Sequence, residues 1–105
     1  MDKAAQIIWH KRIDFKNGVF EAYIQVLKIP IRDKFPDGFK LKCVLVNTEL
    51  NIPVLLVDNH EPFGYHMHTR LPYDKKYRVK LNVNSYQDAI SLFMSEVEKV
   101  VNNET

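Results

Sequence analysis

The chain has 105 residues, of which 15 are Lys or Arg, 13 are Asp or Glu, and 46% are hydrophobic. At this length, folding buries roughly two-thirds of the surface of the unfolded chain, enough for one hydrophobic core and too little for two independent domains. The composition excludes wholesale disorder, so we expect a single domain over residues 1–105. A net charge of +2 does not by itself indicate a nucleic-acid-binding protein.

The cysteine content and the apolar runs bear on the cellular compartment. A single cysteine, Cys43, excludes an internal disulfide framework and fits a reducing compartment. No apolar run approaches the roughly 18 residues that span a membrane, and the N-terminus lacks the composition of a signal peptide. We therefore expect a soluble, cytoplasmic protein without a membrane partner.

The first expected element is a β-hairpin. Gln6–Phe15 and Val19–Ile29 flank the turn Lys16–Gly18, whose Asn-Gly step tolerates positive φ. In the second run, hydrophobic residues alternate with more polar ones, which is typical of a strand with one buried face.

Three further strands are expected before the end of the chain. After a loop over residues 30–38, Phe39–Val46 alternates before it becomes apolar on both faces, and Ile52–Val57 has the apolar pattern of a central strand. The run Tyr77–Val83 alternates again and predicts a fifth strand.

The last expected element is a helix over about residues 85–102. Ser85 followed by Asp88 resembles an N-terminal capping arrangement. Apolar residues then recur at helical spacing, namely Tyr86, Ala89, Ile90, Phe93, Val97, Val100 and Val101. This stripe predicts a helix packed on the sheet, with docking of a partner as the alternative. The sequence therefore predicts an α+β fold, with a roughly five-stranded, mainly antiparallel sheet within residues 6–83 and a C-terminal helix on one face.

Three of the four histidines lie in the segment Val57–Arg70, directly after the most apolar expected strand. Loops anchored on a rigid element often carry binding and catalytic groups. A bend at the proline and the glycine of this segment would return His66 and His68 toward Asp58 and His60.

One chemistry that this segment supports is metal binding. In an extended segment His66 and His68 point to one side and present two imidazoles to one cation, with Asp58 or His60 as a further ligand. However, H-x-H is common without a metal, and no histidine follows His68 as a cupin-type site would require. We therefore expect no cofactor, and a divalent metal held by Asp58, His66 and His68 is the alternative.

A second chemistry is metal-free acid–base cleavage of RNA. Histidine titrates near neutral pH, so His66 and His68 can serve as the base for the 2′-hydroxyl and the acid for the leaving oxygen, with Asp58 orienting one imidazole. His60 is a further catalytic candidate from the same segment. The basic residues expected to contact phosphate are Lys40, Arg70 and Arg78.

A third interpretation is structural, because Asn, Asp and His side chains satisfy backbone groups in turns. His10, beside Trp9, is expected to be an ordinary strand residue. The basic residues after the histidine segment are interleaved with Tyr73 and Tyr77; they are Lys75, Lys76, Arg78 and Lys80. This pattern is typical of a surface for single-stranded nucleic acid, and equally of a solvated edge strand protected by lysines.

Two motifs resemble those of the TumE-like proteins, small toxin components of type II toxin–antitoxin pairs. Asp37–Leu41 (DGFKL) is similar to the G-[YF]-K-Y start of a strand in that family, and Asp58–His68 is similar to its D-N segment followed by glycine and H-x-H. The order of elements also matches, over roughly Trp9–Val101. The chain departs from the family pattern at Leu41, where relatives carry tyrosine, and in the segment after His68.

The resemblance implies a growth-inhibiting protein neutralised by a cognate helix-turn-helix antitoxin, with RNA as the usual target of such toxins. It also implies that the functional centre is formed by Lys40, Asp58, Asn59, His66 and His68. The leading hypothesis is therefore an endoribonuclease toxin. The alternatives are a non-catalytic module that binds a nucleotide or a protein, and a metal-dependent hydrolase. A homodimer is expected if the apolar helix face exceeds what the sheet covers.

Overall fold

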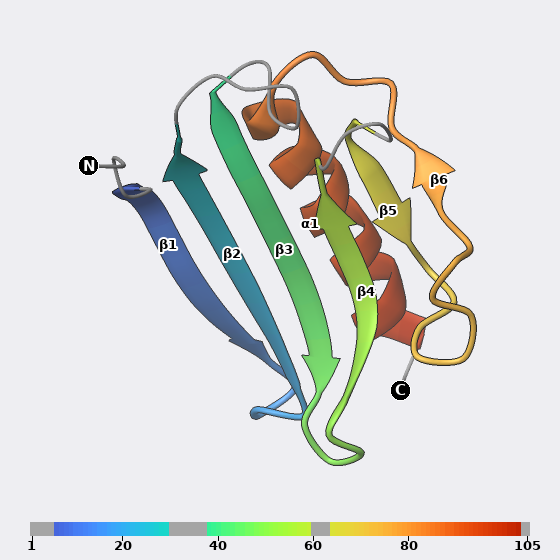
Figure 1. The fold of residues 1–105 in the computed structure, drawn as a ribbon. Helices are drawn as coiled ribbons and strands as arrows, with labels where there is room; N and C mark the ends of the chain where they lie inside the picture. Colours follow the sequence, from blue (N-terminus) through green and yellow to red (C-terminus); the bar gives the residue numbers. More distant parts are fainter. Residues whose placement is uncertain (1–5, 30–37, 60–63, 104–105) are drawn as a thin grey trace.

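The computed structural model describes residues 6–29, 38–59 and 64–103 (Figure 1). Its elements are β1 (Gln6–Phe15), β2 (Phe20–Lys28), β3 (Phe39–Asn47), β4 (Ile52–Asp58), β5 (His66–His68), β6 (Val79–Lys80) and α1 (Tyr86–Asn103). The strands lie in the sheet in sequence order, and each is antiparallel to its neighbour. The helix covers one face of the sheet, against β2, β3 and β4. The predicted α+β architecture is confirmed.

The first hairpin turns at Lys16–Gly18, as the Asn-Gly step predicts. All three residues have positive φ, from 54° at Lys16 to 89° at Gly18, a region that Asn and Gly enter at low cost. The N–H of Gly18 donates to the carbonyl of Phe15 at 3.1 Å. The turn fixes the register of β1 against β2, in which Phe15 lies opposite Phe20.

The helix begins at the predicted cap. The backbone N–H of Asp88 donates to Oγ of Ser85 at 3.2 Å, which satisfies a group that has no partner inside the helix. The buried residues of the helix follow the predicted stripe and are Ala89, Phe93, Val97 and Val101. They pack on the apolar face of the sheet and close the hydrophobic core.

The alternation of side chains along the strands separates an apolar face from a polar one. On the face toward the helix, paired positions form a buried row of Ile24, Cys43, Val57 and Met67. On the opposite face, the neighbouring paired positions form a polar row of His10, Gln25, Lys42, Asp58, His66 and Lys80. The register of the sheet therefore brings Asp58 next to His66 on the face away from the helix.

The prediction of a strand over Tyr77–Val83 is wrong in its extent. Only Val79–Lys80 pairs, because β5 offers three residues and the register places Lys80 opposite His66. Lys76 and Arg78 therefore lie outside the paired strand that contains Lys80. The strand β5 itself was not predicted within the histidine segment. Residues 30–37 of the expected loop lie outside the described residues.

Candidate functional site

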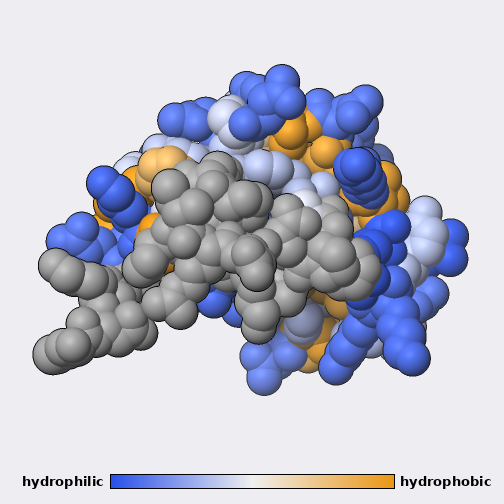
Figure 2. Space-filling model, turned by 45° about the horizontal axis from the view of Figure 1, so that its top comes forward, coloured by the Kyte–Doolittle hydropathy of each residue, from blue (hydrophilic) through white to orange (hydrophobic). Residues whose placement is uncertain are grey.

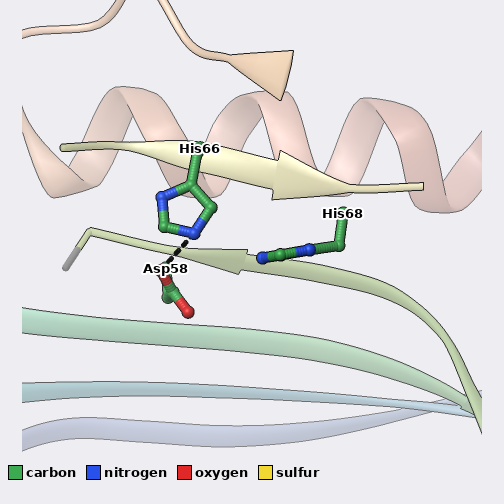
Figure 3. Close-up of side chains that lie close together, drawn as sticks. All are labelled: Asp58, His66 and His68. Atoms are coloured by element: carbon green, nitrogen blue, oxygen red, sulfur yellow. Dashed lines mark ion pairs between the residues drawn. The ribbon is translucent and has the colours of Figure 1, made fainter. Parts of the chain in front are cut away.

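Asp58 and His66 form an ion pair across two neighbouring strands. Asp58 ends β4, His66 begins β5, and their Cα atoms are register partners. Nε2 of His66 lies 2.8 Å from Oδ1 of Asp58 (Figure 3). The side chain of His66 is only 4% exposed, whereas that of Asp58 is 29% exposed, so solvent reaches the pair from the carboxylate side.

The second ring nitrogen of His66 is also engaged. Nδ1 lies 2.8 Å from the carbonyl oxygen of Gly64, which can only accept a hydrogen bond. Gly64 has φ +61°, and the space where a Cβ would stand is open, so the backbone conformation is what favours glycine here. Nδ1 therefore carries a proton, and Nε2 faces a second acceptor, the Asp58 carboxylate. A second proton on the ring, a proton on the carboxyl group, or a bound cation satisfies this contact.

His68 lies two residues further along β5, on the same face of the sheet as His66 (Figure 3). The two rings meet edge to face, with centroids 5.0 Å apart and an interplanar angle of 74°. His68 is 7% exposed, and its Nδ1 is buried without a hydrogen-bond partner in the described part of the chain. One potential ligand atom from each of Asp58, His66 and His68 lies within 4.8 Å of the other two.

Cys43 lies next to this cluster in the sheet, but on the opposite face. It pairs with Val57 and is fully buried under the helix. Burial, with a smaller contribution from the negative charge of Asp58, raises the pKa of the Cys43 thiol to about 12. The thiol is therefore protonated at neutral pH and is neither a nucleophile nor a soft metal ligand.

Asn59 has a structural role in the described fold. Its Oδ1 accepts from the N–H of Leu41 at 2.9 Å, and its Nδ2 donates to the carbonyl of Phe39 at 2.8 Å. The side chain is buried and prolongs the pairing of β3 with β4 by one position beyond Asp58. Because both ends of its amide are bonded to the backbone, Asn59 positions the end of β4.

The basic residues predicted to contact phosphate lie in different places. Lys40 is exposed at the start of β3, whereas Arg78 is half-buried just before β6. Arg70 lies over the ring of Tyr77, 3.7 Å from its centroid, and its side chain is 59% exposed. The contacts described for Arg70 are thus with its own turn, and not with the cluster. His60 lies outside the described residues.

Lys42 is the functional candidate that the sequence analysis missed. It is the register partner of Asp58 and is exposed on the polar face. With His10 and Gln25 it lines a hollow of about 240 Å³ in this face. Two signals could have found it, the alternation of Lys40 with Lys42 and the pairing of β3 with β4. Further hydrophilic side chains gather toward the right of Figure 2, the side on which β6 lies in Figure 1.

Comparison with known proteins returns no relative. The chain matches no family model, no curated protein sequence and no solved structure. Among the described residues, no helix is long and apolar enough to cross a membrane.

Proposed function

We propose that this chain is the toxin of a type II toxin–antitoxin pair and that it cleaves RNA at Asp58, His66 and His68. The observation that carries the proposal is the cluster itself. An imidazole held at both nitrogens by Asp58 and Gly64 lies beside a second, buried imidazole whose Nδ1 lacks a hydrogen-bond partner among the described residues. The resemblance of the D-N and H-x-H motifs to TumE-like proteins supports the toxin assignment.

The cluster contains the groups that transphosphorylation of RNA requires. In our mechanism a ring nitrogen of His68 accepts the proton of the 2′-hydroxyl, and the 2′-oxygen bonds to phosphorus. The bond from phosphorus to the 5′-oxygen breaks, and this oxygen takes the proton shared by Asp58 and His66. The products are a 2′,3′-cyclic phosphate and a 5′-hydroxyl. Proton exchange with water then restores both groups.

The polar face supplies positive charge for the phosphate backbone. Lys40 and Lys42 alternate on β3, so both lie on the face that carries Asp58. Cations on such a surface attract RNA irrespective of its sequence. We assign the phosphate contacts to these two lysines, and the exposed edge of Asp58 is the side from which a substrate approaches.

The partner of such a toxin is a cognate helix-turn-helix antitoxin. An exposed apolar strip on the edge strand β1 supports a protein partner, with Ile7 60%, Ile8 44% and Trp9 42% exposed. This strip borders a hollow of about 430 Å³ at Tyr86 and Ile90. We expect that coexpression with a helix-turn-helix protein from the adjacent reading frame suppresses toxicity. Harmless expression of this chain alone would contradict the toxin assignment.

The decisive experiment is cleavage of a defined single-stranded RNA by the purified protein in the presence of EDTA. We expect cleavage by the wild type and by His10→Ala, a control that changes a histidine of the same face outside the cluster. His68→Ala should lose at least about 100-fold in rate, since one proton-transfer group contributes roughly 10²–10⁴-fold. Products ending in a 2′,3′-cyclic phosphate are expected. Unchanged cleavage by His68→Ala refutes the assignment, and cleavage abolished by EDTA assigns the chemistry to a metal-dependent hydrolase instead.

A further inference from the structure

The same three side chains have the composition of a transition-metal site. Two imidazoles and one carboxylate come from the neighbouring strands β4 and β5. Imidazole and carboxylate are the usual ligands of Zn²⁺ and related divalent cations, and three protein ligands with an open position are common in catalytic centres. Mg²⁺ and Ca²⁺ prefer sets made of oxygen atoms alone, so they fit this cluster poorly.

His66 is already oriented as a metal-bound histidine would be. Histidines that bind a metal through one nitrogen usually donate the other N–H to a carbonyl or a carboxylate, which fixes the tautomer. Here Nδ1 of His66 faces the carbonyl of Gly64 at 2.8 Å, and Nε2 is directed at Asp58. A cation between Nε2 and the carboxylate satisfies two acceptor atoms that otherwise face one another.

His68 supplies the second and independent observation. It is a polar side chain that is more than nine-tenths buried, and its Nδ1 has no hydrogen-bond partner among the described residues. Leaving a buried polar atom unsatisfied costs about 1–3 kcal/mol. The ring extends toward the side on which Asp58 lies (Figure 3).

The distances are close to those that a metal requires. With bonds of 2.0–2.1 Å, two ligands of one ion lie at most about 4.2 Å apart, and tetrahedral ligands lie about 3.3 Å apart. The three ligand atoms lie within 4.8 Å of one another, and Nε2 of His66 and Oδ1 of Asp58 are 2.8 Å apart. To reach tetrahedral spacing, that pair must separate by about 0.5 Å and a pair at the outer limit must approach by about 1.5 Å, changes that side-chain rotations can supply.

We propose that Asp58, His66 and His68 bind one divalent transition-metal cation of the Zn²⁺ class, and that this cation inhibits the chain. The metal engages the ring nitrogen of His68 that would accept the 2′-hydroxyl proton, and it replaces the proton between His66 and Asp58. The metal-bound form therefore cannot carry out the proton transfers described above. The inhibitory effect rests on the proposed function, whereas the binding of the metal does not.

The test is a titration of the tag-free, EDTA-treated and dialysed protein with ZnCl₂, followed by calorimetry. We expect one Zn²⁺ per chain in the wild type and in the control His10→Ala, and at least tenfold weaker binding in His68→Ala. Co²⁺ serves as a spectroscopic probe, and its d–d absorption bands should report nitrogen ligands in the wild type and in His10→Ala, but not in His68→Ala. MgCl₂ at the same concentration should give no saturable binding.

Folding of the variants is controlled by far-ultraviolet circular dichroism and thermal unfolding. His68→Gln provides a second, polar replacement that keeps the site hydrated if His68→Ala does not fold. The absence of saturable Zn²⁺ binding by the wild type, or equal affinity in a folded His68 variant, overturns the proposal. A rise in the unfolding temperature with added Zn²⁺, absent in the His68 variants, supports it.

RNA cleavage by the same samples separates this inference from the proposed function. If Zn²⁺ inhibits cleavage and EDTA restores it, the result supports both the inhibitory metal site and the proposed function. Zn²⁺ binding without any RNA cleavage upholds the metal site and overturns the proposed function. Cleavage without Zn²⁺ binding overturns the metal site alone. If cleavage requires Zn²⁺, the metal site is upheld, but inhibition by the metal and the proton-transfer role of His68 are both overturned.

Discussion

Asp58 and His66 lie directly opposite one another at the ends of β4 and β5, and Oδ1 of Asp58 is 2.8 Å from Nε2 of His66. The carbonyl of Gly64 binds the other side of the same ring. One imidazole is thus held in a single orientation between two acceptors. This relationship determines how substitutions at the cluster should behave.

Asp58→Asn should separate the chemistry of the cluster from its folding. The amide keeps the size of the carboxylate but loses its charge and its affinity for a cation. We expect RNA cleavage and Zn²⁺ binding to be lost. The free energy of unfolding should fall by about 1–3 kcal/mol, the value of a hydrogen bond to a charged group. Urea unfolding and the cleavage assay measure the two effects, and wild-type cleavage by Asp58→Asn would contradict the proposed function.

Asn59→Ala should act on stability. The substitution leaves the buried N–H of Leu41 and the carbonyl of Phe39 without their side-chain partner. We expect the free energy of unfolding to fall by about 1–3 kcal/mol, because the buried N–H of Leu41 loses its hydrogen-bond acceptor. Asn82→Ala, at an exposed position between β6 and the helix, is the matched control and should leave the urea midpoint unchanged. Equal midpoints for the two variants would exclude the structural role of Asn59.

Cys43 should make the protein less stable at alkaline pH. Its pKa is about 12 in the folded chain, against 9.0 as the ordinary value, so the unfolded chain releases the proton first. The free energy of unfolding should therefore be unaffected below pH 9 and fall between pH 9 and 12, by about 1.4 kcal/mol per pH unit. Denaturant unfolding at pH 8 and pH 10 tests this, with Cys43→Ala as the reference for other titrating groups. An identical pH dependence in the variant would contradict it.

The same residue should resist alkylation. A buried, protonated thiol is inert, so iodoacetamide at pH 8 should not modify the native protein and should modify Cys43 fully in denaturant. Mass spectrometry measures both reactions. Rapid labelling under native conditions would show that the helix does not cover this position.

Glu21 should contribute a small stabilisation that acid removes. The hydrogen bond from Tyr23, and then the charge of Arg12, lower the pKa of Glu21 from its ordinary value of 4.5. A carboxylate with a lowered pKa stabilises the fold above pH 4.5, and this contribution disappears as the pH falls through the folded-state pKa. Glu21→Gln should therefore narrow the difference between urea midpoints at pH 7 and pH 3. If the midpoints of Glu21→Gln differ between pH 7 and pH 3 as much as those of the wild type, the lowered pKa of Glu21 does not stabilise the fold.

Much of the fold follows from local sequence signals. The Asn-Gly turn and the Ser85 cap depend on residues within a few positions of one another, and both were predicted from the sequence. The extent of β6 was not, because pairing with the three-residue β5 limits it, and alternation in Tyr77–Val83 carries no information on the length of its neighbour. Strand length is a property of the pair and not of one segment.

The candidate site was predictable to a similar degree. Alternation places His66 and His68 on one face, and the pairing of β4 with β5 brings them near Asp58. Two features could not be derived in this way. The hydrogen bond that Nδ1 of His66 donates to the carbonyl of Gly64 depends on a left-handed backbone conformation, and the burial of Asn59 depends on the register of β3. The guanidinium of Arg70, predicted to contact phosphate, lies over the ring of Tyr77, a contact that the sequence pattern did not predict.

The order of the strands has a consequence for how this protein acquires its structure. Every strand pairs with the one before it, so the contacts of the sheet join segments that are close in the chain. Pairing of strands that follow one another in the chain loses less loop entropy than pairing of distant strands. Asp58 and His66 are only eight positions apart. The ion pair between them therefore needs only the pairing of β4 with β5.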